Sequence, residues 1–321
     1  MTSYIIRRVL VAIPLLLGMT FLAFMVIQLG GGEYFAELRL NPQISRETIE
    51  QIEQQFNLDK PAVVQYFYWL KNVLKLDFGY SFSRMASVTG LIRGRVLATM
   101  LLSTSSILVT WLVAIPLGIY CAVHRYSWGD RFASFFAYIG ISIPNFFLAL
   151  LLLYLASVVG ILPLGDMTSA KFDDLSLASK VLDIGKHLII PTVVIATAAM
   201  AGLQRLMRGN MLEVLRAQYI TTARAKGLPE NRVIYVHALR NAINPMISIF
   251  GLQFSSLLGG AALTEIVCSW PGLGSLMLEA VRARDLYVVM GDLLIGGILL
   301  IGGNLLADVL LAWTDPRIRL E

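Results

Sequence analysis

The sequence predicts an all-α membrane protein with six transmembrane helices. Apolar residues make up 57% of the 321-residue chain and charged residues only 15%, with a mean hydropathy of +0.70, far from the composition of soluble domains. Several apolar runs are about twenty residues long, enough for a helix rising ~1.5 Å per residue to cross ~30 Å of hydrocarbon. Polar segments separate these runs, so we expect the chain to cross the membrane repeatedly.

Six segments have the length and apolarity of a span. In chain order they are residues 9–29, 98–123, 132–160, 188–206, 243–263 and 287–313. The first five each contain a proline, which frees a backbone carbonyl that neighbouring helices must satisfy inside a bilayer. We therefore expect kinked helices packed in a bundle, with the third span broken at Pro144.

The sixth span lacks proline but carries two stripes at helical spacing. A small-residue stripe suited to close helix contact comprises Gly296, Gly303 and Ala307. A second stripe, which should face protein or water, comprises Gly297, Asn304 and Asp308. Acids inside a span are functional candidates, so Asp292 and Asp308 are candidate pathway or packing residues. Asn304, a polar residue of the second stripe, is a third candidate. The two acids lie near opposite membrane boundaries and point about 160° apart, which favours structural roles over a catalytic pair.

Charge places both termini in the cytoplasm. Arg7 and Arg8 precede the first span, and Arg317 and Arg319 follow the last, as the positive-inside rule requires. The first apolar run exceeds the ~7–15 residues of a signal-peptide core and no Ala-x-Ala site follows, so we expect a retained span. The expected parts are residues 1–29 (N-terminus and first span), 30–97 (an extracytoplasmic helical element), 98–313 (the membrane core) and 314–321 (a cytoplasmic tail).

The extracytoplasmic element is polar enough to fold at the membrane surface. Ser45 is placed to cap a helix carrying Ile49, Ile52 and Phe56 on one face. Pro61 begins a second helix, which is rich in aromatic residues. Aromatic clusters beside a membrane are more often interfacial anchors than ligand sites, and we interpret this one as an anchor.

The most informative stretch is polar and lies between two apolar spans; we name residues 207–242 the polar connector. Four residues at helical spacing predict one amphipathic helix: Leu212, Leu215, Tyr219 and Ala223. The helix should end at Gly227, because glycine is favoured just past the end of a helix. Pro229 suits the first position of a second short helix. Two helices joined by a tight turn would form a stiff connector. The alternative is a solvated basic loop that merely obeys the positive-inside rule.

The polar connector contains two distinctive motifs. Residues 219–228 have the form Tyr-x-x-Thr-Ala-Arg-Ala-Lys-Gly-Leu, and residues 237–242 are His-Ala-Leu-Arg-Asn-Ala. Together they resemble the cytoplasmic EAA loop of permease subunits in bacterial ABC importers. Ala223, Gly227 and Leu239 match the general EAA pattern. The chain departs from that pattern at Thr221, Thr222, His237 and Arg240. These departures resemble the peptide/nickel branch of the family. The sequence Leu-Asp-Lys-Pro … Leu-Asp-Phe-Gly-Tyr-Ser in the extracytoplasmic element resembles the same branch.

The resemblance implies a type I ABC importer permease fold in a bacterial inner membrane. The chain would enclose a solute path with a second homologous permease subunit, served by two ABC ATPase subunits that hold ATP and Mg, and by an extracytoplasmic solute-binding protein. The polar connector would be the loop that couples to the ATPases, through Arg216, Tyr219, Thr222, Ala223, Arg224, Ala225, Lys226, Gly227, Leu228, His237, Leu239 and Arg240. Of these, close packing is expected at Tyr219, Thr222, Ala223 and Gly227, and charged contacts at Arg224 and Lys226. The implied cargo is a di- or oligopeptide, with nickel chelates, glutathione or another small solute as alternatives.

No catalytic motif occurs, so we expect a non-catalytic subunit without a cofactor of its own. Gly-x-x-x-x-Gly-Lys-Ser/Thr, His-Glu-x-x-His and Gly-x-Ser-x-Gly are absent from the sequence. The three histidines are scattered over separate segments, which argues against a metal site, and no aromatic–basic face indicates nucleic-acid binding. Cys121 and Cys268 are expected at opposite membrane faces, which excludes a disulfide. A stand-alone secondary transporter would require inverted repeats, which are not evident, and an intramembrane protease or transferase would require the missing motifs.

Overall fold

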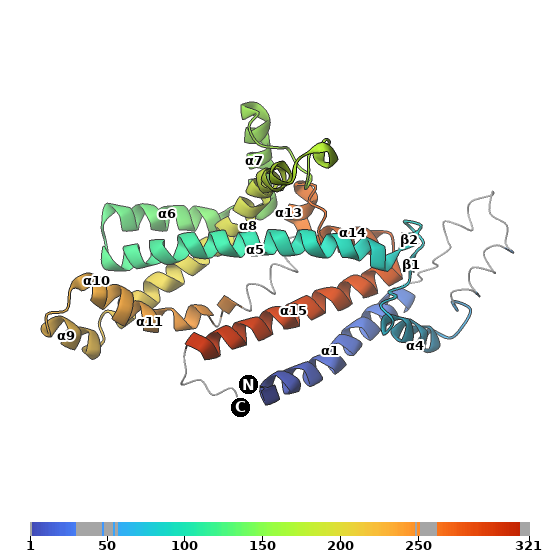
Figure 1. Cartoon of the computed structure of the whole chain (residues 1–321), viewed down its shortest axis with the longest axis horizontal. Helices are drawn as coiled ribbons and strands as arrows, with labels where there is room; N and C mark the ends of the chain where they lie inside the picture. The colour runs from blue at the N-terminus through green and yellow to red at the C-terminus, as the bar shows by residue number, and fades with distance from the viewer. Residues whose placement is uncertain are drawn as a thin grey trace. The chain divides into compact units, whose positions relative to one another are not determined.

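The computed structural model describes residues 2–29, 57–247 and 262–314, together with positions 47, 54, 249 and 250. The chain is mainly helical (Figure 1). It divides into two compact units. Unit 1 is formed by residues 98–271 and 300–321, and unit 2 by residues 2–97 and 272–299. Two long helices, α5 (Val88–Val123) and α15 (Leu286–Thr314), contribute to both units.

Unit 2 contains α1 (Thr2–Leu29), α4 (Ala62–Val73), a hairpin of β1 (Tyr80–Ser81) and β2 (Ala86–Ser87), and α14 (Leu273–Arg282). The two strands pair antiparallel, with Tyr80 opposite Ser87 and Ser81 opposite Ala86. α1 packs on α4, and the unit has one hydrophobic core, whose buried members include Phe24, Tyr66, Trp69, Phe78, Leu276 and Met290. α4 begins directly after Pro61, as predicted. The helix expected from Ser45 lies outside the described residues, apart from positions 47 and 54.

The hairpin of unit 2 is tied to the segments on either side of it. The indole Nε1 of Trp69 donates a hydrogen bond to the carbonyl of Phe78, 3.1 Å away. The hydroxyls of Ser81 and Ser83 each donate to the same carboxylate oxygen of Asp285, both at 2.6 Å. Asp285 is buried and directly precedes α15, so this carboxylate fixes the hairpin to the start of that helix.

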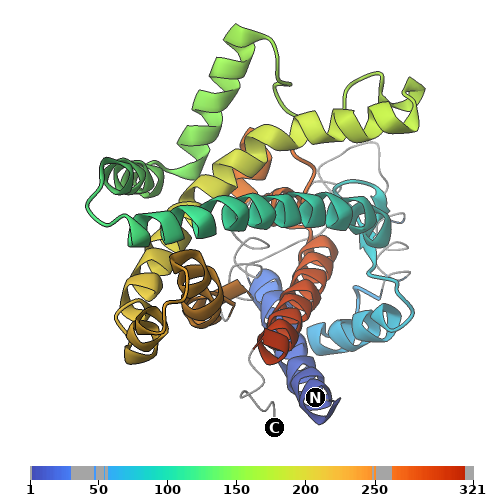
Figure 2. The same ribbon diagram turned by 60° about the vertical axis from the view of Figure 1, so that its left-hand side comes forward.

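Unit 1 contains the remainder of α5, α6 (Trp128–Ser142), α7 (Asn145–Val159), a 3₁₀ turn (Phe172–Asp174), α8 (Leu177–Val214) and α13 (Ala262–Val267). α6, α7 and α13 all pack against α8, and α13 also packs on α7. Figure 2 shows α8 as a long rod from which the polar connector continues at one end. α8 is therefore the scaffold on which the rest of unit 1 is assembled.

Four described helices are long and apolar enough to span a membrane, namely residues 4–29 of α1, all of α5 and α8, and residues 286–306 of α15. A fifth span is present if α6 and α7 are taken together. The expected fifth segment, residues 243–263, lies mostly outside the described residues. The described part thus confirms a helical protein with several membrane-length helices.

Two spans are longer than expected. α5 begins at Val88 rather than at residue 98, and α8 runs from Leu177 to Val214 rather than over 188–206. A serine precedes each helix: the Ser87 hydroxyl accepts from the amide of Gly90 at 3.3 Å, and that of Ser176 from the amide of Ser179 at 3.4 Å. These N-caps satisfy amides that the helix leaves unpaired, so each helix starts at its cap rather than at the edge of the apolar run.

The expected third span is broken at Pro144, as predicted, and the break separates two helices. α6 ends at Ser142, α7 begins at Asn145, and the two axes are bent by 105° at the break. Ile143 is extended (φ −89°, ψ 122°), because a residue before proline is disfavoured in the helical region. Pro144 is extended as well (ψ 138°), so the chain leaves α6 in a new direction.

At the unit 2 end of α15, close helix contact falls on Gly297 and not on Gly296 of the predicted stripe. A Cβ at Gly297 would lie 2.4 Å from Cδ2 of Leu16 in α1, whereas a Cβ at Gly296 would meet nothing within 4 Å. Gly297 therefore permits the approach of α1 and α15 in unit 2, in place of the expected Gly296. Gly303 is buried, and the side chain of residue 307 is outside the description.

Candidate functional site: the polar connector

The polar connector consists of the end of α8 and four short helical segments in unit 1. After α8 come α9 (Gln218–Ala225), α10 (Glu230–Arg232), a π-helical segment η2 (Val233–Ala238) and α11 (Leu239–Ala242). Both ribbon views show these segments gathered at one end of α8 (Figures 1 and 2). α9 and α10 pack on η2, and α11 packs on both η2 and α8.

The apolar side of the polar connector is buried in its own unit. Its buried residues are Ile220, Ala223, Val233, Ile234, Ala238 and Ala242. They form one hydrophobic cluster with Met207 and Met211 of α8 and with Ala114 and Ile119 of α5. A solvated loop would not bury a continuous apolar face, so the packing favours the stiff connector over the loop interpretation.

The predicted single helix from Leu212 to Gly227 is broken. α8 ends at Val214, and Ala217 is extended (φ −69°, ψ 146°) before α9 begins. Hydrogen bonds from the amides of Arg216 and Ala217 to carbonyls three residues earlier, at 3.1 and 3.0 Å, tighten the last turn of α8. The break reorients the chain so that Ile220 of α9 reaches the same core as Met211 of α8.

The turn after α9 has the geometry that Gly227 predicts. Gly227 has φ +75°, in the left-handed region that favours glycine. Its amide donates to the carbonyl of Arg224 at 2.9 Å, and the Leu228 amide donates to the carbonyl of Ala223 at 3.4 Å, which together form a Schellman cap. Pro229 is extended (ψ 140°) and precedes α10 as its cap, one position earlier than expected.

An ion pair spans this turn. Arg224 donates from Nη2 to Oε1 of Glu230 at 2.6 Å and from Nε to Oε2 at 3.1 Å. Hydrogen bonding to Glu230 raises the pKa of the Arg224 guanidinium, and the same contact lowers the pKa of the Glu230 carboxyl. Arg224, expected to contact a partner protein, is thus engaged within the connector, whereas Lys226 is exposed beside it.

Two asparagines brace the polar connector. Asn241 of α11 donates from Nδ2 to the hydroxyl of Tyr219 in α9 at 2.8 Å, and Asn210 of α8 donates to the carbonyl of Ala242 at 3.1 Å. Asn241 lies within the motif of residues 237–242, but sequence reasoning gave neither asparagine a role. These hydrogen bonds link α9 to α11 and α11 to α8, so the two ends of the connector are held together.

The exposed surface of the polar connector is basic and rich in small residues. The expected contact residues that are exposed are Arg216, Tyr219, Thr222, Arg224, Ala225, Lys226, Gly227 and Arg240. Leu228, His237 and Leu239 are half-buried, and Ala223 is buried against the chain's own core. Close packing at Ala223 is therefore made with this chain, while Thr222 and Gly227 leave the backbone open to approach.

A second ion pair, which was not anticipated, joins the start of the connector to α6. Arg208 of α8 donates from Nε and Nη2 to the two carboxylate oxygens of Asp130 in α6, both at 2.8 Å. Asp130 is only 3% exposed and also accepts from the amide of Tyr126 at 2.9 Å. The sequence placed these residues 78 positions apart on different segments, so only the fold reveals the pair.

The candidate pathway residues fall in different units. Asp292 is buried in the part of α15 that belongs to unit 2, and Asn304 and Asp308 are half-buried in the part that belongs to unit 1. Sequence reasoning missed Glu265 of α13, which is 1% exposed and accepts from the hydroxyl of Thr99 at 3.3 Å. Among the described residues, no group of three or more histidines, cysteines or acids is arranged to hold a metal ion.

Comparison with known proteins covers the whole length of the chain. Residues 114–320 match the family described as binding-protein-dependent transport system inner membrane component, and residues 1–103 match the N-terminal family of the same systems. The first of these matches includes the whole polar connector. Together with the membrane-length helices, they show a multi-pass membrane protein.

Individual relatives align from end to end. The oligopeptide transport system permease protein AppB of Bacillus subtilis is 42% identical over 320 residues, covering 99% of both chains. The dipeptide transport system permease protein DppB of Alkalihalophilus pseudofirmus is 34% identical over 339 residues, covering 99% of this chain and 100% of that one. A putative peptide transport system permease protein of Brucella abortus is 37% identical over 321 residues, covering 100% of both.

Proposed function

This chain belongs to the family of binding-protein-dependent transport system inner membrane components, and from that premise we propose that it is a permease subunit of an ATP-driven importer of peptides. The observation that carries the proposal is the polar connector, a capped, internally braced element whose exposed face is basic. A connector of this kind suits transmission of force from a partner better than recognition of a small solute.

The proposed architecture is a type I permease fold with six spans and both termini in the cytoplasm. The four membrane-length helices and the α6–α7 pair support five of the spans, and the apolar segment 243–263 would be the remaining one. Residues 30–97 would lie on the extracytoplasmic side of the membrane, and the polar connector would lie on the cytoplasmic side. A second homologous permease would complete the solute path, and a solute-binding protein would deliver the cargo.

The proposed mechanism is rigid-body movement of the polar connector. Two ATPase subunits would bind ATP and Mg, and the connector would seat in a groove on one of them through Thr222, Lys226 and Gly227. Because Ile220 and Val233 share a core with α8 and α5, displacement of the connector would move both helices. Coupling requires that the connector make different contacts in the two states of the ATPases. A stiff connector can transmit the movement between these states to the membrane helices because it is not itself deformed.

Peptides are the proposed cargo because the relatives named above are oligopeptide and dipeptide permeases. Nickel chelates, glutathione or another small solute remain the alternatives within the same machinery. The chain would be non-catalytic, with no cofactor of its own, because hydrolysis would occur on the ATPases. A stand-alone secondary transporter is the alternative from another class.

The test is uptake of a labelled peptide by proteoliposomes that contain the complete complex, with and without ATP. We expect uptake that requires ATP and the binding protein, and loss of uptake in Gly227→Asp with the protein still in the membrane, because aspartate at φ +75° strains the turn and adds charge. Gly185→Asp is the matched control and should keep uptake, since Gly185 is an exposed helical glycine of α8, outside the polar connector, with nothing within 4 Å of a Cβ. Full uptake by Gly227→Asp, or uptake driven by an ion gradient alone, would contradict the proposal.

A further inference from the structure

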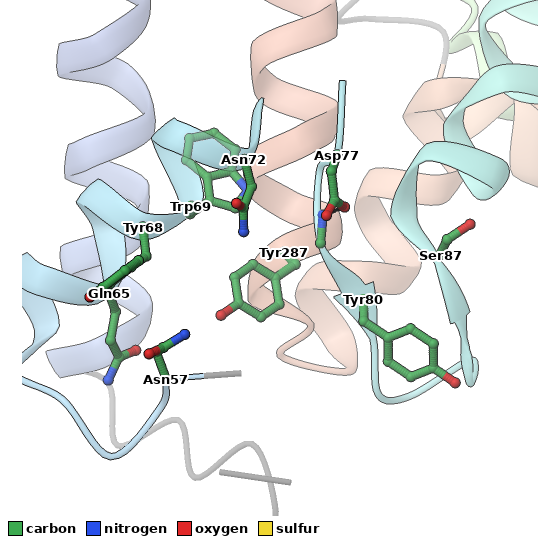
Figure 3. A pocket seen from close by; sticks show the side chains of 10 residues that line it. Asn57, Gln65, Tyr68, Trp69, Asn72, Asp77, Tyr80, Ser87 and Tyr287 are labelled. Carbon is green, nitrogen blue, oxygen red and sulfur yellow. Dashed lines mark hydrogen bonds between the residues drawn. The ribbon is translucent and has the colours of Figure 1, made fainter. Parts of the chain in front are cut away.

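A cavity of about 340 Å³ lies within unit 2, between α4, the segment that follows it and Tyr287 of α15 (Figure 3). Its volume is at the lower end of the ~300–1,000 Å³ typical of small-molecule sites. The lining residues are Asn57, Gln65, Tyr68, Trp69, Asn72, Asp77, Gly79, Tyr80, Ser87 and Tyr287. Sequence reasoning interpreted the aromatic residues here only as an interfacial anchor.

The walls of the cavity are fixed by contacts that leave little freedom. Gly79 has φ +99°, and a Cβ there would lie 3.0 Å from Cγ of Tyr287, so the close approach of this ring requires glycine. Gln65 uses both ends of its amide: it donates to the carbonyls of Leu58 and Lys60 at 3.0 and 2.8 Å and accepts from Gln28 at 3.0 Å. The cavity is therefore preformed, which lowers the entropic cost of binding.

Other polar groups of the lining are available to a ligand. The side-chain amides of Asn57 and Asn72 make no hydrogen bond to the residues that the structure describes. Asp77 accepts from the amide of Gly79 through Oδ1 at 3.0 Å, and its Oδ2 has no partner in the described chain. Figure 3 shows the Tyr287 ring between Asn57 and Asn72 on one side and Asp77 on the other.

The charge of the lining selects the kind of ligand. Among the described residues of the lining, Asp77 is the one acid, and none is a lysine, arginine or histidine. The faces of tyrosine and tryptophan rings attract cations, and at the rim the ammonium of Lys60 already lies 4.8 Å from the centroid of the Tyr68 ring. An anion would meet the carboxylate, whereas a cation on an apolar stem would satisfy both the carboxylate and the rings.

We propose that this cavity binds an arginine or lysine side chain of a free peptide. The cationic group would pair with Asp77, the stem would lie against Tyr80 and Tyr287, and the amides of Asn57 and Asn72 would pair with the peptide backbone. The inference rests on the proposed function in taking the ligand to be a peptide and in placing unit 2's cavity outside the membrane. It adds a subsite for basic peptides on the permease itself.

The test is binding of acetyl-Gly-Arg-Gly-amide and of its citrulline counterpart to the complex of permease and ATPase subunits in nanodiscs, without binding protein and without ATP. Isothermal titration should show that the arginine peptide binds about two- to fivefold more tightly, because only arginine offers a charge-assisted bond to the exposed carboxylate of Asp77. Asp77→Asn should remove this preference, while its side-chain oxygen can still accept from the amide of Gly79. Asp59→Asn, an exposed acid outside the lining, should keep the full preference.

Equal affinity for the two peptides, or an unchanged preference in Asp77→Asn, would overturn the inference. If Asp77→Asn does not assemble, the wild-type complex still decides, because the preference for arginine must shrink as salt concentration rises. Asn72→Ala should weaken the binding of both peptides equally, because the proposed contact of Asn72 is with the peptide backbone, which the two peptides share. If the complex takes up peptide with ATP but does not prefer the arginine peptide, only this inference is wrong. If the complex prefers the arginine peptide but shows no ATP-driven uptake, only the proposed function is wrong.

Discussion

The guanidinium of Arg224 and the carboxylate of Glu230 form a two-point ion pair across the turn between α9 and α10, with Nη2 2.6 Å from Oε1. The pair closes the same turn that Gly227 caps and that the EAA-like motif identifies. Both side chains are about half exposed, at 42% and 53%, so the pair contributes to the shape of the turn more than to global stability.

The pH dependence of this turn follows from the lowered pKa of Glu230. A carboxyl whose pKa is lower in the folded chain stabilises the fold above its ordinary pKa, here 4.5, and loses that contribution as pH falls through the folded value. We therefore expect the amides of Gly227 and Leu228 to lose protection in hydrogen exchange, beyond the intrinsic pH effect, only as pH falls below 4.5.

At neutral pH, Glu230→Gln should accelerate exchange of the same amides about two- to fivefold, in line with ~0.2–1 kcal/mol for an exposed pair. Glu213→Gln, an exposed acid on α8, is the control and should leave the rates unchanged. Identical exchange in both variants would show that the pair does not hold the turn.

The hydrogen bond from Asn241 to Tyr219 should couple α9 to α11 energetically. In a double-mutant cycle of Tyr219→Phe and Asn241→Ala, we expect a coupling of about 0.5–1 kcal/mol in the free energy of unfolding of the detergent-solubilised chain. Tyr235→Phe, an exposed tyrosine of η2, should show no coupling to Asn241→Ala. Additive effects of Tyr219→Phe and Asn241→Ala would mean that the bond does not brace the connector.

The ion pair between the buried Asp130 and the partly exposed Arg208 should be costly to break but replaceable as a whole. Asp130→Ala is expected to reduce the free energy of unfolding by about 1–3 kcal/mol, because it leaves a partly desolvated guanidinium without a counter-charge. The double variant Asp130→Leu/Arg208→Met should recover most of that loss. Thermal unfolding checks both, with Asp174→Ala as an exposed control; a double variant no better than Asp130→Ala would contradict the account.

Adjacent glycines of α15 should respond in opposite ways to a single methyl group. Gly297→Ala is expected to destabilise the purified chain by about 1–3 kcal/mol, because the methyl group would overlap Leu16. Gly296→Ala should be neutral or stabilising by about 0.5–1 kcal/mol, the ordinary gain of alanine in a helix. Leu16→Ala should rescue Gly297→Ala; if it does not, the contact of α1 and α15 is not made there.

Local chemistry was sufficient to predict several elements from the sequence. The long apolar runs predict helices that span a membrane, because a bilayer core satisfies no backbone polar group. Gly227 predicts the end of α9, and Pro61 the start of α4, because each residue restricts the backbone by itself. The motifs around residues 219–228 and 237–242 led to the family, which the comparisons confirm.

Tertiary structure decided what depends on neighbours distant in sequence. Helical periodicity could not show that α9 separates from α8, because the break is set by the core that Ile220 and Met211 share. A proline predicts a break at residue 144 but not its 105° angle, which arises as α6 and α7 each pack on α8. The partners of Asp130, Gly297 and Asp285 are likewise brought together only by folding, because they lie far apart in the sequence. The sequence states the charge or size of a side chain but not which distant residues it contacts.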